Sequence, residues 1–145
     1  MFKKILVPVD GSEGSWRALA DALEIGGKFG SELVVVNVIQ PFNNAALLAM
    51  PGGSVILDRD NTELEEIGNH ILDLAKEKVG AYPNKAEYLV EVGHPSERII
   101  AIAGKAECDA IIIGSRGLSG IAEFFLGSVS SKVAQYANVP VLITK

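Results

Sequence analysis

The sequence predicts a single α/β domain, built on a doubly wound parallel sheet of five strands with helices on both faces. Short runs of β-branched and aliphatic residues alternate with longer segments whose apolar residues recur three and four positions apart, which is the pattern of βα units. Most connections are short, and this order favours a parallel sheet with right-handed crossovers. The chain has 145 residues, about the length of one domain, so we expect residues 1–145 to form one unit.

The first βα unit begins with an apolar run from Lys4 to Val9, which is followed by Asp10, Gly11 and Ser12. Ser12 is a suitable N-cap because its hydroxyl can accept a hydrogen bond from the first turn of a helix. Gly30 is suited to the C-terminal cap of that helix. The expected buried face of the helix consists of Ala18, Leu19, Ala22, Leu23, Ile25 and Phe29.

The second unit begins with the run from Leu33 to Ile39, which is continuously apolar enough for a strand covered on both faces. A helix is expected from Glu63 to Val79, ending at Gly80. Between them, the segment from Gln40 to Asn61 is about 20 residues long, above the usual connection of roughly four to six. It is either a lid over a site or a plain surface insertion. The expected inner face of the helix is Leu64, Ile67, Ile71, Leu74, Ala75 and Val79.

The remaining elements complete the sheet. We expect strands from Ala86 to Val92, from Ala110 to Ile113 and from Val139 to Thr144. One helix begins at Pro95, because proline suits the first helical position, and another runs from about Ser128 to Ala137. The residues expected to face the core from these helices are Ile99, Ile100, Ile102, Ala103, Val129 and Val133.

Composition excludes several classes of protein. Thirteen Lys and Arg against 18 Asp and Glu give a net charge of -5, which argues against nucleic acid as a partner. No apolar run approaches the roughly 18–20 residues that span a bilayer, so no membrane association is expected. The N-terminus does not resemble a signal peptide, and we expect a cytoplasmic protein. Cys108 is the single cysteine, which cannot form an internal disulfide, and we expect an inert thiol.

Two segments that follow strands carry the chemistry. Open α/β sheets bind ligands at the carboxyl ends of their strands, beside the point where strand order reverses. Asp10, directly after the first strand, can accept hydrogen bonds from ribose hydroxyls or hold the water shell of a metal; alternatively it only tightens the turn. After the fourth strand, Gly114, Gly117, Gly127 and Ser128 form the pattern G-x-x-G-x9-G-S.

Each part of this glycine pattern suits a phosphate. Glycines let backbone N–H groups approach an anion, and the helix that begins after Gly127 adds unpaired N–H donors. Ser128 and Ser130 add hydroxyls, and Arg116 adds a fixed positive charge. The alternative is a flexible turn followed by a serine-capped helix. The chain has no P-loop motif and no dinucleotide-binding G-x-G-x-x-G after its first strand, which disfavours P-loop NTPases and NAD binding.

The runs Ile5 to Ser12, Gly114 to Ser131 and Pro140 to Ile143 resemble the universal stress protein family over the whole chain. The G-x-x-G-x9-G-S pattern is similar to the motif of the ATP-binding branch of that family. The resemblance implies an adenine nucleotide alpha hydrolase-like fold with strand order 3-2-1-4-5. That order would place Asp10 and Gly114 on adjacent strands.

The resemblance also implies a binding site. Adenine would lie near Val9 and Val38, where strand backbone groups read its edge, Pro8 would shape the pocket and Asp10 would meet the ribose. Mg²⁺ or Mn²⁺ would be held mainly by phosphate oxygens and water. The complete set of implied nucleotide-binding residues is Pro8, Val9, Asp10, Val38, Ile113, Gly114, Arg116, Gly117, Gly127, Ser128, Val129 and Ser130.

The leading hypothesis is an ATP-binding stress or signalling protein whose bound state is read by an unknown partner or by its own dimer. Hydrolysis is expected to be slow or absent, since phosphoryl transfer needs a base or water-orienting group and no candidate stands in the motif. The alternatives are an ATP hydrolase or adenylate-transferring enzyme that uses the same pocket, and a dimerisation module that binds no nucleotide. The resemblance implies a homodimer through the edge strand from Val139 to Thr144.

Overall fold

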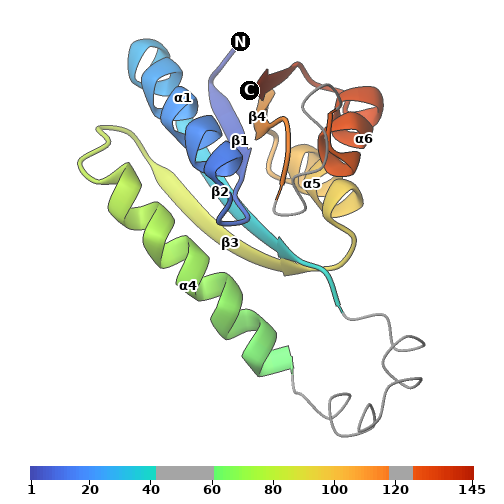
Figure 1. Ribbon diagram of the computed structural model, residues 1–145. Helices are drawn as coiled ribbons and strands as arrows, with labels where there is room; N and C mark the ends of the chain where they lie inside the picture. The colour runs from blue at the N-terminus through green and yellow to red at the C-terminus, as the bar shows by residue number, and fades with distance from the viewer. Residues whose placement is uncertain (42–60, 118–125) are drawn as a thin grey trace, which may run out of the picture.

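The computed structural model describes residues 1–41, 61–117 and 126–145. These residues form a sheet of five parallel strands in the order β3-β2-β1-β4-β5, which confirms the expected topology (Figure 1). The central strand β1 pairs Leu6 with Val34 on one side and with Ile111 on the other. The strands are β1 Lys4–Pro8, β2 Glu32–Ile39, β3 Ala86–Val92, β4 Ala110–Gly114 and β5 Val141–Thr144.

Helices cover both faces of the sheet, as expected of a doubly wound fold. Helices α1 (Glu13–Phe29) and α4 (Asn61–Val79) lie on one face, and α5 (Pro95–Lys105) and α6 (Ser128–Tyr136) lie on the other (Figure 1). Successive strand residues alternate between the faces, so Val7 packs with α1 and Leu6 packs beneath α5. The result is two apolar cores separated by the sheet.

The expected ends of α1 are confirmed. The Ser15 N–H donates to Ser12 Oγ at 3.2 Å, and Gly30 has φ +69°, the left-handed conformation that glycine adopts readily. One expected core residue is wrong, because Phe29 is 62% exposed. Its ring contacts the ring of Phe2, with centroids 5.4 Å apart, and Phe2 precedes β1. Phe29 therefore packs against the segment before the sheet and not in the core.

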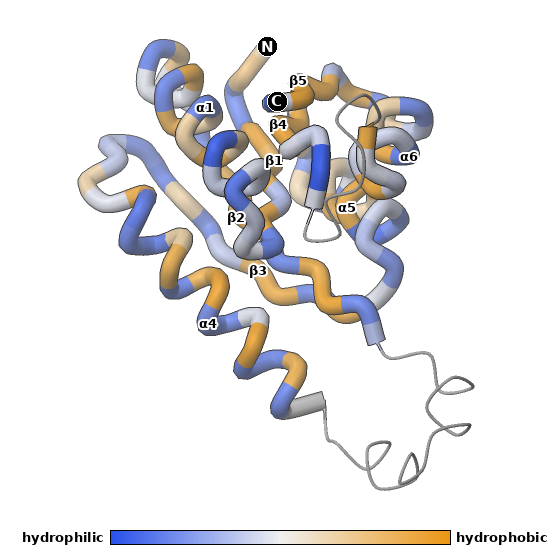
Figure 2. The backbone as a smooth tube through the Cα atoms, viewed as in Figure 1, coloured by the Kyte–Doolittle hydropathy of each residue, from blue (hydrophilic) through white to orange (hydrophobic). Residues whose placement is uncertain are grey.

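The expected inner face of α4 is also partly wrong. Ile67 is 58% exposed and Leu74 is 37% exposed, whereas Leu72, which the spacing did not select, is buried. Gly68 explains the rotation, since a Cβ at this position would lie 2.8 Å from Val90 Cγ1 in β3. The side of α4 that carries Gly68 therefore faces the sheet. Hydrophobic and hydrophilic residues alternate along the helix (Figure 2). The residues that line its buried side are Gly68, Leu72, Ala75 and Val79.

Four strand ends differ from the expected ranges. Strand β2 begins at Glu32 rather than at Leu33, and β4 ends at Gly114 rather than at Ile113. The first strand ends at Pro8 rather than at Val9, and the last begins at Val141 rather than at Val139. Pro140 has no N–H to donate, although its carbonyl accepts a hydrogen bond from Ile111 N–H at 2.9 Å. The segment from Gln40 to Asn61 lies mostly outside the described residues. None of the described helices is long and apolar enough to span a bilayer.

Candidate functional site

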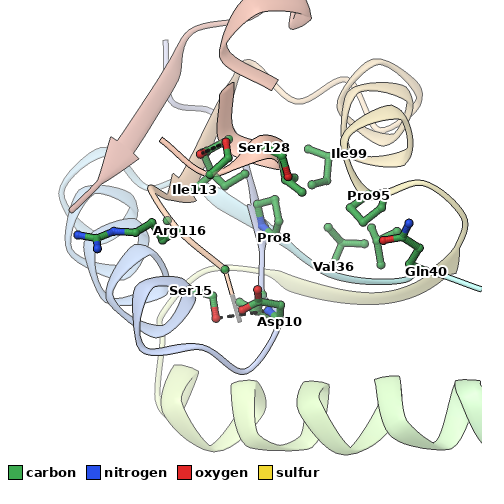
Figure 3. Close-up of a pocket in the computed structure, with 17 residues that line it drawn as sticks. Pro8, Asp10, Ser15, Val36, Gln40, Pro95, Ile99, Ile113, Arg116 and Ser128 are labelled. Carbon is green, nitrogen blue, oxygen red and sulfur yellow. Dashed lines mark hydrogen bonds between the residues drawn. The ribbon is translucent and has the colours of Figure 1, made fainter. Parts of the chain in front are cut away.

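A cavity of about 410 Å³ opens at the carboxyl ends of β1, β2 and β4 (Figure 3). It lies where strand order reverses, because β1 leads through α1 to β2 while β4 leads to β5 on the opposite side. This volume falls within the roughly 300–1,000 Å³ of small-molecule sites. The described residues that line it are Pro8, Val9, Asp10, Ser15, Val36, Val38, Gln40, Pro95, Ile99, Ile113, Gly114, Arg116, Gly117, Gly127, Ser128, Val129 and Ser130.

All twelve residues of the expected nucleotide-binding set, which the resemblance completed, line this one cavity. Five further lining residues were missed: Ser15, Val36, Gln40, Pro95 and Ile99. Val36 stands two positions before Val38 on the same strand, so strand periodicity puts both on one face and could have identified it. Pro95 and Ile99 begin the helix that follows β3 at the same edge of the sheet. Only the packing of α5 beside β2 brings them to the cavity.

One wall of the cavity is apolar. Val36 and Val38 from β2 face Pro95 and Ile99 from α5, and Ile113 closes the wall from β4. Figure 3 shows Val36, Pro95 and Ile99 on the same side of the pocket, with Pro8 between them and Ile113. Such a wall suits a flat apolar group, since small-molecule sites combine apolar linings with few polar contacts.

Asp10 lies at the opposite end of the cavity and organises the turn into α1. Its Oδ1 accepts a hydrogen bond from Ser12 N–H at 2.9 Å, and its own N–H donates to Ser15 Oγ at 3.3 Å. Gly11 follows with φ +88°, a conformation that side chains rarely adopt. Asp10 therefore does tighten the turn, and the turn orients its carboxylate. A Cβ at Gly117 would lie 2.8 Å from Asp10 Oδ2, so Gly117 lets the two strand ends meet.

The other two motif glycines are also sites of close approach. A Cβ at Gly114 would lie 2.7 Å from the carbonyl carbon of Gly14, so the first turn of α1 packs directly on the end of β4. Gly127 N–H donates to the Ser115 carbonyl at 2.7 Å. A Cβ at Gly127 would lie 3.2 Å from the same oxygen. The glycines therefore bring backbone from β4, α1 and α6 to the cavity without side chains between them.

The N-terminus of α6 presents unpaired donors to the cavity. Gly127 is its N-cap and offers no side chain, and the first turn carries no acidic residue. The first intrahelical bond runs from Ser131 N–H to the Gly127 carbonyl, so helix geometry leaves the N–H groups of residues 128–130 without an intrahelical acceptor. The helix dipole adds partial positive charge at this end. Together these features suit a phosphate group.

The polar side chains of the motif differ in what they offer. Ser130 is buried, and its hydroxyl lies 2.9 Å from the Ser115 carbonyl and 3.1 Å from the Gly127 carbonyl. These backbone carbonyls accept its hydrogen, so Ser130 links the end of β4 to the start of α6. Ser128 is exposed at the start of α6. Arg116 is exposed too, and in Figure 3 its guanidinium points away from the other labelled side chains. Its charge reaches the cavity only after the side chain rotates.

Two observations concern metal and thiol chemistry. Within residues 1–41, 61–117 and 126–145, no group of three His, Cys, Asp or Glu side chains could hold a metal ion. Cys108 is buried away from the cavity, between α5 and β4, and burial raises the pKa of its thiol to about 11. The thiol is therefore protonated at neutral pH, as expected of an inert cysteine.

Comparisons with known proteins agree with this architecture. The model of the universal stress protein family matches residues 1–145. Universal stress protein YxiE of Bacillus subtilis (strain 168) is 34% identical over 150 residues, which covers 100% of both chains.

Solved structures of universal stress proteins also match this chain over nearly its whole length. The structure of protein MJ0577, a universal stress protein of Methanocaldococcus jannaschii, has a TM-score of 0.81 and 29% identity and covers 100% of this chain and 96% of that one. A universal stress protein in complex with cAMP has a TM-score of 0.74 and 25% identity, covering 99% and 97%. The Archaeoglobus fulgidus protein in complex with dAMP has a TM-score of 0.71 and 26% identity, covering 100% of each chain.

Proposed function

Because the chain belongs to the universal stress protein family, we propose that it binds ATP in the cavity at the carboxyl edge of its sheet. In this proposal it acts as a nucleotide-dependent factor in a cytoplasmic stress or signalling response. The nucleotide-bound state is read by a partner protein or through its own dimer.

One observation carries the proposal. Asp10 and the glycine pattern are about a hundred residues apart in sequence and were selected for different parts of a nucleotide, yet they line one cavity. The cavity has an apolar wall for a base at Val36 and Val38, and a helix N-terminus for phosphates at Ser128. Relatives that hold cAMP and dAMP support an adenine nucleotide as the ligand class.

The proposal includes a divalent cation at the phosphate end of the cavity. Asp10 is the one carboxylate among the described lining residues, and its Oδ1 already accepts a hydrogen bond from Ser12 N–H. We therefore assign the ligands of Mg²⁺ or Mn²⁺ mainly to phosphate oxygens and water, which is the way Mg²⁺ usually binds beside substrate phosphates. The cation would neutralise phosphate charge that the exposed Arg116 does not reach in this arrangement.

Hydrolysis is proposed to be slow or absent. Phosphoryl transfer requires a group that orients water or accepts its proton, together with cations placed on the transferred phosphate. The described lining residues include no histidine, lysine or glutamate, and Asp10 is held in a turn. Gln40, an amide that could orient water, lies beside Pro95 and Val36 at the apolar wall (Figure 3). Multiple turnover well above a metal-free control would instead support the hydrolase or adenylate-transferring alternative.

The proposal also includes a homodimer that forms through the C-terminal strand. Strand β5 pairs with β4 on one side, and among the described residues no strand pairs with its other side. Leu142 on β5 is 41% exposed. An apolar edge strand of this kind tends to pair with another chain unless it is protected.

Isothermal titration calorimetry with ATP, ADP, AMP and GTP in the presence of Mg²⁺ tests ligand binding. We expect binding selective for adenine nucleotides, and we expect Gly127→Val combined with Ser128→Leu to abolish it, because the added side chains occupy the start of α6. Gly27→Val is the matched control, since a Cβ at Gly27 meets nothing within 4 Å. ATP affinity that is unchanged in the double variant would disprove the site.

A further inference from the structure

The backbone of β2 alternates its hydrogen bonds between two neighbours. Leu33 N–H donates to the Lys85 carbonyl at 2.9 Å and the Ile39 carbonyl accepts from Gly93 N–H at 2.9 Å, so odd-numbered residues bond toward β3. Glu32 N–H donates to the Lys3 carbonyl at 2.8 Å, on the side of β1. Even-numbered residues therefore bond toward β1, and the backbone of Val38 points to that side.

Strand β1 ends before it reaches Val38. The register of the two strands stops at the pair Pro8 and Val36, and the last rung runs from Val9 N–H to the Val36 carbonyl at 2.8 Å. If the ladder continued, the next rung would join Val38 N–H to the Val9 carbonyl. The hydrogen bonds among the described residues do not include this rung.

The side chain of Asn37 donates to the Val9 carbonyl in place of Val38 N–H. Asn37 Nδ2 donates to the Val9 carbonyl at 2.8 Å, and Asn37 is only 3% exposed. Its Oδ1 lies beneath α4, 3.1 Å from the position of a Cβ on Gly68, so the helix fixes the amide in place. A buried asparagine in an apolar strand costs stability unless its polar atoms are bonded, and the bond to the Val9 carbonyl satisfies its amide N–H.

We propose that Asn37 is a positioning residue for base recognition, a step that rests on the proposed binding of an adenine nucleotide. Its amide donates to the Val9 carbonyl, which ends the hydrogen-bond ladder between β1 and β2. The N–H and carbonyl of Val38 are therefore left free at the apolar wall of the cavity. One donor beside one acceptor matches the adenine edge, where N1 accepts a hydrogen bond and the 6-amino group donates one. Asn37 itself does not touch the ligand.

Amide hydrogen exchange measured by NMR on the ligand-free protein tests the ladder. In the wild type, Val38 N–H should exchange much faster than Leu33 N–H, which is bonded to Lys85 in the same strand. In Asn37→Leu the Val9 carbonyl becomes free to accept Val38 N–H, and Val38 should become protected. Equal protection of Val38 and Leu33 in the wild type would overturn the proposal.

Calorimetry with two nucleotides tests base recognition. The pair is ATP and purine riboside triphosphate, which lacks the 6-amino group, both with Mg²⁺. The wild type should prefer ATP by roughly fivefold, the value of one hydrogen bond, and Asn37→Leu should reduce this preference to about onefold. Asn37→Val, which also removes the donor and suits a strand, should behave in the same way.

A control separates positioning from general destabilisation. Leu33→Val alters a fully buried residue of the same strand and should keep the wild-type preference for ATP. An unchanged preference in both Asn37 variants would overturn the role of Asn37 while leaving ATP binding intact. A wild type that binds neither nucleotide would overturn the proposed function and base recognition together, and the exchange rate of Val38 would still decide the ladder.

Discussion

Asp10 combines a structural role in the turn with the ligand contact that we propose for it. Its Oδ1 closes the turn onto Ser12, while its Oδ2 faces Gly117 across the cavity mouth. The sequence left two interpretations open, a turn-forming residue or a ligand contact, and the geometry makes them compatible. A carboxylate held by the turn loses little further freedom on binding, which lowers the cost of binding a ribose or hydrated metal ion.

The burial of the Cys108 thiol should make the stability of the folded protein depend on pH. The pKa of its thiol is raised from 9.0 to about 11 in the folded protein, chiefly by burial. The folded state therefore keeps this proton in a range where the unfolded state releases it. The free energy of unfolding should be unaffected below about pH 9 and should fall as pH rises toward about 11.

Urea unfolding at pH 8, 9 and 10 measures this effect. Cys108→Ala should show a shallower loss of stability than the wild type across this range, because only the wild type has the thiol to titrate. Parallel losses in the two proteins would assign the pH dependence to other groups.

At the scale of an element, α4 illustrates how packing chooses a helix face. The apolar residues of α4 form two overlapping stripes that share Val79: the expected one, which includes Ile67 and Leu74, and another that includes Leu72. Gly68 settles the choice because a glycine allows the closest approach to β3 and Ile39. Leu72 is consequently 3% exposed, and Ile67 stands at 58%.

Substitutions on the two stripes should differ sharply. Leu72→Ala should lower the free energy of unfolding by about 2–5 kcal/mol because it leaves a cavity between α4 and the sheet. Ile67→Ala should change it by no more than about 0.5 kcal/mol, since most of the side chain is already in water. Chemical denaturation of both variants checks the orientation of α4, and similar losses would contradict it.

At the scale of the whole molecule, β5 leaves one side of the sheet without a paired strand among the described residues. Its other side is well anchored, since Ser115 N–H donates to the Thr144 carbonyl at 2.8 Å and Thr144 Oγ1 donates to Asp21 at 2.6 Å. A strand fixed in this way presents a rigid edge, which favours pairing with a second copy of the chain.

Leu142→Lys should therefore convert the proposed homodimer to a monomer. The substitution places a charge on the exposed edge, a common natural protection against pairing, without removing a bond to β4. Light scattering at micromolar concentration measures the mass. Ile67→Lys is the control, because it places the same charge on an exposed residue of α4 and should leave the dimer intact. A wild type that is already monomeric would refute the dimer itself.

The sequence by itself determined the alternation of strands and helices, the caps at Ser12 and Gly30, and the glycine pattern, because each depends on neighbouring residues only. The strand order was available only through the resemblance to a family, since periodicity carries no information about which strands pair. Asp10 and the glycine pattern, selected from the sequence, line one cavity together with the residues that the resemblance implied. They lie at or just after the carboxyl ends of strands or at the start of α6, and parallel strands end at one edge.

Only the tertiary structure decided which face of α4 is buried, where the Arg116 side chain points, and that Asn37 holds the carbonyl of Val9. Each of these depends on contacts between residues distant in sequence: Gly68 against Val90, and Asn37 against a strand 28 positions away. The local sequence pattern determines whether a segment forms a helix or a strand. The packing of segments against one another determines which side chains are buried and which groups they bond. Differences of a few tenths of an ångström in interatomic distance decide whether two segments fit together. The order of residues in the sequence does not contain these distances.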